Sequence, residues 1–126
     1  MGSLIRGVTM PTNLKELRCE HVSASEAGDY FQVVFEQTRD SHVGYVLVQR
    51  QFEMPDGGKC YVETDDQQFC GHFRIRNAQL SRDQFRMTFG RGPVQQITVS
   101  FSVTDSAYAE AKRVLQIMIP DLELAS

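Results

Sequence analysis

The side chains best suited to metal chemistry are two cysteines and a histidine in the middle of the chain. Cys70 and His72 would share one face of a strand, and Cys60 precedes them on a neighbouring segment. Thiolate and imidazole groups are ligands that zinc prefers. However, no Cys-x-x-Cys or His-x-x-x-His pair completes such a site, and free cysteine commonly packs as a small apolar side chain. We therefore expect no metal and no cofactor.

Nucleophilic catalysis would require a serine or cysteine held beside a base. The sequence contains no Gly-x-Ser-x-Gly turn, and its three histidines, His21, His42 and His72, have no recognisable partners. Gly90-Arg91-Gly92 precedes a proline and a strand rather than a helix, so it predicts a turn and not a phosphate cradle. These patterns favour a protein that is not an enzyme.

Acidic and basic residues are segregated along the middle of the chain. Between residues 53 and 66 five acidic residues accompany one lysine, and between residues 72 and 91 five arginines accompany one aspartate. The acidic residues are Glu53, Asp56, Glu63, Asp65 and Asp66. They lack the ligand spacing of a calcium loop, so we interpret them as surface carboxylates.

Three of the arginines form an alternative candidate site. Arg74, Arg76 and Arg86 are expected on outward faces of strands, where planar guanidinium groups suit phosphate. These faces lack interleaved aromatic side chains for stacking bases, and the nearby acidic stretch would repel a nucleic-acid backbone. The second hypothesis is therefore a small regulatory domain that binds anions or nucleic acid through an arginine-rich sheet face. Cross-strand pairing of these arginines with acids explains them equally well.

Alternating apolar and polar residues predict that most of the chain forms strands. Two hairpins are expected, because Pro55-Asp56-Gly57-Gly58 and Gly90-Arg91-Gly92-Pro93 are strong turn sequences between alternating segments. Asp65-Asp66-Gln67 predicts a further turn, and the small polar residues Ser23 to Gly28 predict a loop. The expected strands are residues 17–22, 30–35, 44–50, 60–63, 69–76, 85–89 and 97–103.

The C-terminal part of the chain predicts a single helix. Thr104 or Asp105 can cap its start, the helix runs to Ile119, and Pro120 stops it. Apolar residues recur at helical spacing between these limits, which predicts that one stripe packs against a sheet. The expected fold is α+β, with an antiparallel, curved β-sheet of about six to seven strands and one C-terminal α-helix packed on it.

Two of the expected strands, residues 30–35 and 44–50, carry apolar side chains on both faces. One helix can cover only one face of a sheet, so the other face needs a cover of its own. We expect either strong curvature of the sheet or a homodimer.

Length and composition place the chain among folded globular proteins. Its 126 residues are 41% hydrophobic and 23% charged, with a formal net charge of −3, and they fit one domain over residues 1–126. Residues 1–14 are expected to be flexible or in part not native, with Met10 as a candidate start. No apolar stretch approaches the roughly 20 residues of a membrane span, and none forms a secretory signal. The odd number of cysteines favours reduced thiols, so we expect a cytoplasmic protein with no membrane partner.

Several segments between Gly44 and Ile119 together form a pattern similar to that of a known family. They are Tyr45-Val46-Leu47-Val48-Gln49-Arg50, Tyr61-Val62-Glu63, the aromatic residue and Gly71 that follow Gln67-Gln68, and Leu80-Ser81-Arg82-Asp83-Gln84-Phe85. A strand over 97–103, an acidic cap and a helix with an aromatic residue follow. This pattern resembles the immunity protein 10 family of bacterial polymorphic-toxin systems, although that family often has two glycines where this chain has Gly71 and His72.

The resemblance implies a small, non-enzymatic, intracellular protein that binds and neutralises a cognate toxin domain, and this is the first hypothesis. Many toxins that cut nucleic acid have basic clefts, which an acidic surface can occupy. The expected partner-binding residues are therefore Glu53, Asp56, Glu63, Asp65 and Asp66. Ordinary solvated turns explain these acids as well, and Glu63 is also placed to pair with Arg50 across strands. A protein partner is expected, rather than nucleic acid.

Overall fold

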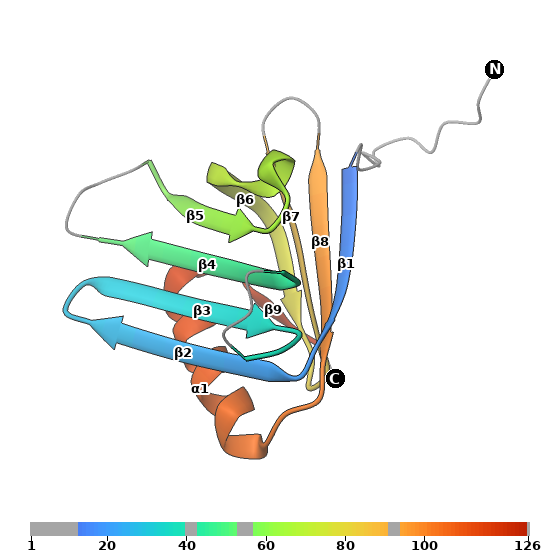
Figure 1. Ribbon diagram of the computed structural model, residues 1–126. Helices are drawn as coiled ribbons and strands as arrows, with labels where there is room; N and C mark the ends of the chain where they lie inside the picture. Colours follow the sequence, from blue (N-terminus) through green and yellow to red (C-terminus); the bar gives the residue numbers. More distant parts are fainter. Residues whose placement is uncertain (1–12, 40–42, 53–56, 91–93, 126) are drawn as a thin grey trace.

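The protein is built mainly of strands, as the computed structural model shows (Figure 1). The structure describes residues 13–39, 43–52, 57–90 and 94–125. The strands are β1 (Asn13–Cys19), β2 (His21–Ala27), β3 (Tyr30–Glu36), β4 (Tyr45–Gln51), β5 (Lys59–Thr64), β6 (Gly71–Leu80), β7 (Gln84–Phe89), β8 (Gln95–Phe101) and β9 (Glu123–Leu124). The helices are the short 3-10 helix η1 (Gln67–Phe69) and the α-helix α1 (Asp105–Met118). The expected α+β composition, mostly sheet with one α-helix, is confirmed.

The strands form one sheet, and their number exceeds the expected six to seven because this sheet has 9 strands. Eight of them follow the order β1-β8-β7-β6-β5-β4-β3-β2, and β9 pairs with β6 off this path. Neighbouring strands are antiparallel except for two parallel pairs, β1 with β8 and β6 with β9. The sheet is therefore mostly antiparallel, and it stays open between β1 and β2 at the two ends of the path.

The sequence-based prediction is wrong in the N-terminal part of the chain. The expected strand 17–22 is divided between β1 and β2, which meet at a corner at Glu20. The expected loop 23–28 lies in β2 as far as Ala27 and pairs with β3. β1 begins at Asn13, within the segment expected to be flexible. Because β2 is the last strand of the sheet path and is largely exposed, small polar side chains are compatible with it.

Both expected hairpins are confirmed. β4 and β5 are antiparallel with Val48 opposite Val62, and β7 and β8 are antiparallel with Met87 opposite Ile97. Gly57 in the first turn has a φ of 73°, a conformation that glycine adopts without the steric cost of a Cβ. Gly58 and Gly90 also have positive φ, whereas the expected turn residues 55–56 and 91–93 lie outside the described part of the chain.

The helix α1 begins and ends close to the expected limits. The Thr104 hydroxyl accepts a hydrogen bond from the Ala107 backbone N–H at 3.2 Å, and Ile119 is the C-terminal cap before Pro120. The buried residues of the helix are Ala111, Val114, Leu115 and Met118. This apolar stripe faces the inner side of β2 and β3, so the helix packs on the sheet as expected.

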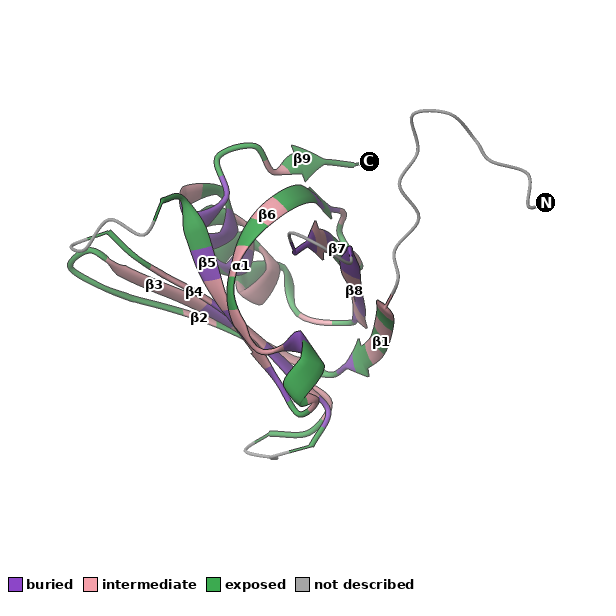
Figure 2. Cartoon of the chain, turned by 90° about the horizontal axis from the view of Figure 1, so that it is seen from above, coloured by how far each residue is buried: buried purple, intermediate pink, exposed green. Residues whose placement is uncertain are grey.

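The long strand β6 bends the sheet. Its first residues, as far as Arg74, pair with β5, whereas the residues from Ile75 onward pair with β7. The register shifts between Ile75 and Asn77, which is a β-bulge, and bulges bend a strand and increase its twist. Figure 2 shows the resulting curve, with β2 to β5 on one side, β7, β8 and β1 on the other, and α1 inside the bend. The expected curvature is present.

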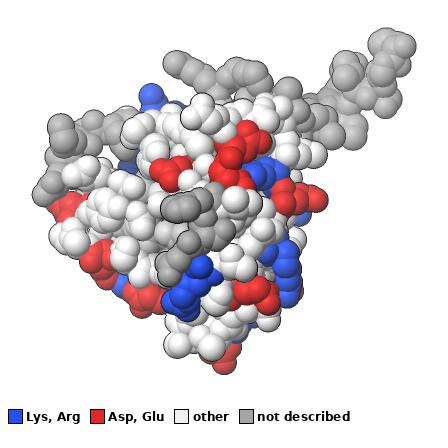
Figure 3. Space-filling model, in the orientation of Figure 1, with Lys and Arg blue, Asp and Glu red and all other residues white. Residues whose placement is uncertain are grey.

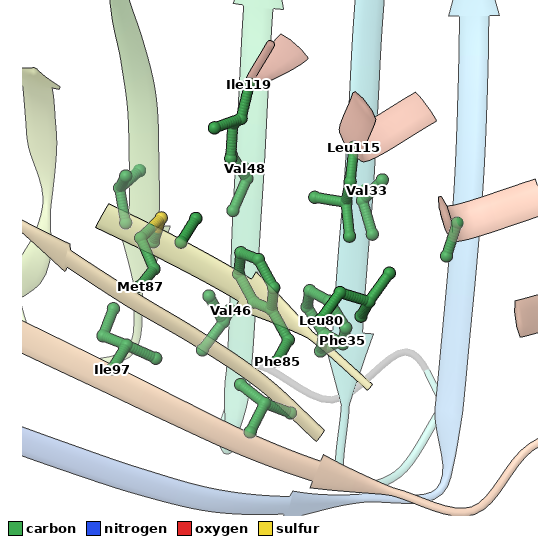
Figure 4. Packing of buried hydrophobic residues seen from close by; sticks show 14 of the residues in the cluster. Val33, Phe35, Val46, Val48, Leu80, Phe85, Met87, Ile97, Leu115 and Ile119 are labelled. Atoms are coloured by element: carbon green, nitrogen blue, oxygen red, sulfur yellow. The ribbon is translucent and has the colours of Figure 1, made fainter. Parts of the chain in front are cut away.

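The core fills the space between the two halves of the bent sheet. Phe35 from β3 stacks on Phe85 from β7, with ring centroids 5.4 Å apart and 9° between the ring planes. Val46 and Val48 from β4 lie on the same inner side and are fully buried, and Leu115 reaches this cluster from α1 (Figure 4). The buried apolar residues form one cluster, so both halves of the sheet and the helix share one core.

The curvature does not cover the second face of β3 and β4. Val34 and Leu47 are opposite each other on that outward face and are half-buried, whereas their neighbours Val33 and Val48 are fully buried in the core. Among the described elements, β4 makes its main contacts with its neighbours β3 and β5, whereas α1 packs on the inner side of β2 and β3. Curvature alone therefore does not supply the cover that we expected, and the homodimer stays a prediction.

Candidate binding surface

The outward face of β3, β4 and β5 presents a cluster of tyrosines. Gln49 lies opposite Tyr61 and Val34 lies opposite Leu47, so alternate residues of the three strands share this face. We call it the tyrosine face. Its main members are all half-buried. They are Tyr30, Val34, Tyr45, Leu47, Tyr61 and Glu63. Figure 3 shows a mostly uncharged surface over β3 and β4, with charged side chains around it.

Glu63 holds two of these tyrosines in place. The Tyr45 hydroxyl donates a hydrogen bond to Glu63 Oε2 at 2.7 Å, and the Tyr61 hydroxyl donates to Glu63 Oε1 at 2.9 Å. One carboxylate therefore fixes rings from two neighbouring strands. Hydrogen bonds to an ionised acceptor are stronger than neutral ones, so both rings are ordered before a partner arrives.

The same contacts raise the pKa of both tyrosine hydroxyls, which are protonated at neutral pH even at the usual tyrosine pKa. Burial, together with the hydrogen bond to Glu63, raises the pKa of Tyr45 above its usual 10.0. The hydrogen bond to Glu63, together with burial, raises the pKa of Tyr61. Each hydroxyl donates its single proton to Glu63, so its oxygen can only accept a hydrogen bond from a partner and is not activated as a base or nucleophile. This favours recognition over proton-transfer chemistry at this surface.

Aromatic side chains extend the tyrosine face toward both of its borders. Tyr61 lies opposite His72 of β6, and the two rings are 5.1 Å apart between centroids with 48° between their planes. On β3 the Tyr30 hydroxyl donates to Gln32 Oε1 at 2.7 Å. Rings from β3, β4, β5 and β6 thus contribute to one continuous surface.

Asp65, one of the expected partner-binding residues, has two partners within the protein. Lys15 Nζ lies 2.8 Å from Asp65 Oδ1, and the Gly44 backbone N–H donates to Asp65 Oδ2 at 2.7 Å. The Lys15 and Asp65 side chains are only 15% and 21% exposed. The hydrogen bonds from Lys15 and Gly44 hold the pKa of Asp65 below its usual 3.8. Asp65 thus joins β1, at one end of the sheet path, to the segment after β5.

Replacing Asp65 by asparagine is expected to reduce the free energy of unfolding at pH 7 by about 1–2 kcal/mol, because Lys15 loses its counter-charge. The folded-state pKa of Asp65 is lowered, so its stabilisation is complete above the unfolded-state pKa of about 4. It disappears as the pH falls through the lower folded-state pKa, so the deficit of the variant should shrink toward pH 3. Urea denaturation at pH 7 and at pH 3 measures this difference. Glu16→Gln, on the exposed side of β1, is the control, and an equal deficit at both pH values would contradict the expectation.

The other expected acidic contacts divide into two groups. Asp66 caps the 3-10 helix η1, because its Oδ1 accepts a hydrogen bond from the Gln68 backbone N–H at 3.2 Å. Glu53 and Asp56 lie outside the described residues. Three of the five expected acidic contacts are described by the structure, and of these only Glu63 therefore belongs to the tyrosine face. Direct contact of the other acids with a partner stays a prediction.

The three candidate arginines do not lie together. Arg74 and Arg76 project from β6 and line one hollow, whereas Arg86 lies on β7 between Gln79 and Thr98 of the neighbouring strands. All three side chains are exposed, as the sequence predicts. The structure thus separates Arg86 from the other two.

Arg50 does not pair with Glu63. Its side chain lies on the inner face of β4, where Nη1 donates to the Met118 carbonyl oxygen at 2.7 Å, and its guanidinium carbon lies 4.5 Å from the centre of the Phe52 ring. A cation that binds the last carbonyl groups of a helix stabilises that end. Arg50 therefore holds the C-terminal end of α1 on the sheet.

The residues considered for zinc binding point in different directions. Cys60 is buried, with Sγ 3.9 Å from the Met118 carbonyl oxygen, and Cys70 Sγ lies 3.3 Å from the Thr64 carbonyl oxygen. His72 is exposed on the outward face. Within the described ranges, no group of three or more His, Cys, Asp or Glu side chains could hold a metal ion.

The sequence contained part of the signal for the tyrosine face. Tyr61 and Glu63 are two residues apart in a predicted strand, so they had to share a face. The contribution of Tyr45 depended on the register of the β4–β5 hairpin, which the long turn between these strands leaves open. The sequence therefore predicted a binding surface from the acidic residues of segment 53–66, and it did not predict the two ordered tyrosines.

Comparison of the chain with protein-family models, curated proteins and solved structures found no match. Among the residues that the structure describes, no helix is long and apolar enough to cross a membrane.

Proposed function

We propose that this chain is a non-enzymatic binding protein that neutralises a protein toxin by covering it with the tyrosine face. The observation that carries this proposal is the pair of half-buried tyrosines, Tyr45 and Tyr61, fixed by Glu63 on the outward face of the sheet. The resemblance to immunity proteins supports the choice of a toxin as the partner.

The chemistry of the tyrosine face suits a protein partner. Tyrosine is enriched among the residues that dominate protein–protein binding energy, because it combines a large apolar ring with a polar tip. Val34 and Leu47 add apolar surface between the rings of β3 and β4. Because Glu63 already orders the rings, less side-chain entropy is lost when a partner binds.

The acidic hypothesis is retained in a narrower form. Glu63 carries a negative charge into the middle of the tyrosine face, whereas Asp65 and Asp66 have the intramolecular partners described above. A basic side chain of the toxin that approached Glu63 would meet a carboxylate flanked by two aromatic rings. The centre of contact is therefore placed at Glu63 rather than along the whole acidic stretch.

Growth rescue tests the proposal. The toxin domain encoded beside the gene is expressed in cells with the wild-type chain, with Tyr61→Ala or with Arg86→Ala, and surviving cells are counted. The wild type and Arg86→Ala, whose substitution lies in the other half of the sheet, are expected to restore growth, whereas Tyr61→Ala is expected to restore it poorly. Failure of the wild type, with both proteins well expressed, would reject neutralisation of that toxin. Full rescue by Tyr61→Ala would move the contact away from the tyrosine face.

A further inference from the structure

A cationic groove lies beside the tyrosine face, at the border between β5 and β6. It encloses about 570 Å³. The side chains that line it are Lys59, His72, Phe73, Arg74 and Arg76, together with the backbone of two glycines. No described residue that lines it carries a carboxylate. The groove therefore combines positive charge with one apolar wall.

The strand geometry brings the two arginines together. Arg74 lies opposite Lys59 in the β5–β6 register, and Arg76 lies at the β-bulge between Ile75 and Asn77. Residues two positions apart in a strand share a face, and the side chains of Arg74 and Arg76 both line the same hollow. Arg74 is held there by a hydrogen bond from its Nη2 to the Gly57 carbonyl oxygen at 3.0 Å.

We propose that this cationic groove binds a small phosphate-bearing molecule, with the phosphate between Arg74 and Arg76 and the organic part against Phe73. The planar guanidinium forks match phosphate oxygens and bind them with two parallel hydrogen bonds. A phosphate monoester carries about −1.5 to −2 charges at neutral pH. The two positive charges of the arginines match this charge better than they match the single negative charge of a carboxylate. The volume lies within the range of about 300–1,000 Å³ that small-molecule sites occupy.

A neighbouring hollow of about 380 Å³ shares both arginines but is less suited to an anion. Its lining includes the carboxylates of Asp121 and Glu123 and the C-terminal end of α1 at Met118. Carboxylates and the negative end of a helix dipole both repel phosphate. The ligand is therefore placed on the side of the groove that contains Lys59 and Phe73.

His72 borders both this groove and the tyrosine face, but Arg74 and Arg76 lie outside the tyrosine face, so substituting them tests this site separately from the proposed toxin binding. Isothermal titration calorimetry of the full chain at low salt tests it with inorganic phosphate, AMP and adenosine. AMP is expected to bind at least about tenfold more tightly than adenosine, because the charge-assisted hydrogen bonds require the phosphate. Arg74→Ala and Arg76→Ala are each expected to weaken AMP binding about tenfold or more.

Arg86→Ala is the matched control, because it removes an exposed arginine from β7 outside the groove. It is expected to change AMP binding by less than about twofold. Thermal unfolding of each variant separates loss of binding from loss of folding, and Arg76→Ala provides a second variant that leaves the bond from Arg74 to Gly57 intact. Equal binding of AMP and adenosine, or equal effects of the three substitutions, would overturn the proposal. Binding of a short single-stranded oligonucleotide without binding of AMP or phosphate would also overturn it, in favour of a nucleic-acid surface.

Discussion

Replacing Phe35 by alanine is expected to lower the free energy of unfolding by about 4 kcal/mol. Phe35 is fully buried on β3, stacks on Phe85 of β7 and lies 5.8 Å from the ring of Phe101 at the end of β8. The substitution removes these contacts between the two halves of the bent sheet and leaves a cavity that the core can fill only in part. Since small domains are stable by only about 5–15 kcal/mol, this one ring accounts for a large share. Urea denaturation at neutral pH measures the loss.

Phe52→Ala is the matched control for Phe35→Ala. Phe52 is also aromatic, but it is 40% exposed and contacts Phe31 and Arg50 at the border of the sheet. Its replacement should cost much less, about 1–2 kcal/mol, because 40% of its surface already meets water and the border of the sheet can close around the smaller side chain. Similar losses for the two substitutions would mean that the contact between Phe35 and Phe85 does not hold the two halves together.

Replacing Tyr61 by alanine is expected to weaken binding of the proposed toxin partner by about 30-fold or more. The substitution removes one of the two rings that Glu63 orders on the tyrosine face, together with the hydroxyl that donates to Glu63. It also removes the neighbour of the His72 ring. Calorimetry or surface plasmon resonance with the purified toxin domain measures the change in affinity.

Two further variants separate the ring of Tyr61 from its hydroxyl and from general effects. Tyr61→Phe keeps the ring and loses only the bond to Glu63, so its affinity should fall by about tenfold or less. Arg86→Ala should bind as the wild type does. If Tyr61→Phe proves as weak as Tyr61→Ala, the hydroxyl and not the ring makes the decisive contact. Wild-type affinity in Tyr61→Ala would show that the partner binds elsewhere.

The elements that were predicted correctly depend on short stretches of sequence. Thr104 and Pro120 mark the ends of α1 because capping and the missing proline N–H act within one helical turn. The β7–β8 hairpin follows from alternation around a glycine and proline turn. Such local signals are present in the chain before any tertiary contact forms, so they survive in the folded protein.

The errors arise where distant segments decide the structure. Residues 23–28 look like a loop because they are small and polar, yet they form the edge strand β2 through pairing with β3. An edge strand needs only one neighbour and can keep its other side in water, so its residues need not be apolar. Similarly, β1 pairs in parallel with β8, and a parallel partner far along the chain leaves no turn sequence between the two strands that would reveal it.

The acidic and basic segments were predicted correctly from the sequence, but the contacts that their side chains make were predicted only in part. Asp65 is acidic and follows a strand, as expected. However, Lys15 of β1, the strand at one end of the sheet path, forms an ion pair with it. Arg86 alternates like Arg74 and Arg76, yet it lies on β7 opposite Gln79 of β6 and does not line their groove. Both results depend on how the strands pair, which local sequence does not determine.

The sequence by itself determined the secondary-structure class, the two hairpins and the single C-terminal helix, because alternation, turn residues and caps act over a few neighbouring residues. Only the tertiary structure decided which side chains meet. The register of β4 against β5 places Tyr45 and Tyr61 on one carboxylate, and the pairing of β5 with β6 brings Lys59 beside Arg74 at the groove. A register and a bend are selected by the packing of the entire core, since shifting a strand by one residue would exchange its buried and exposed faces.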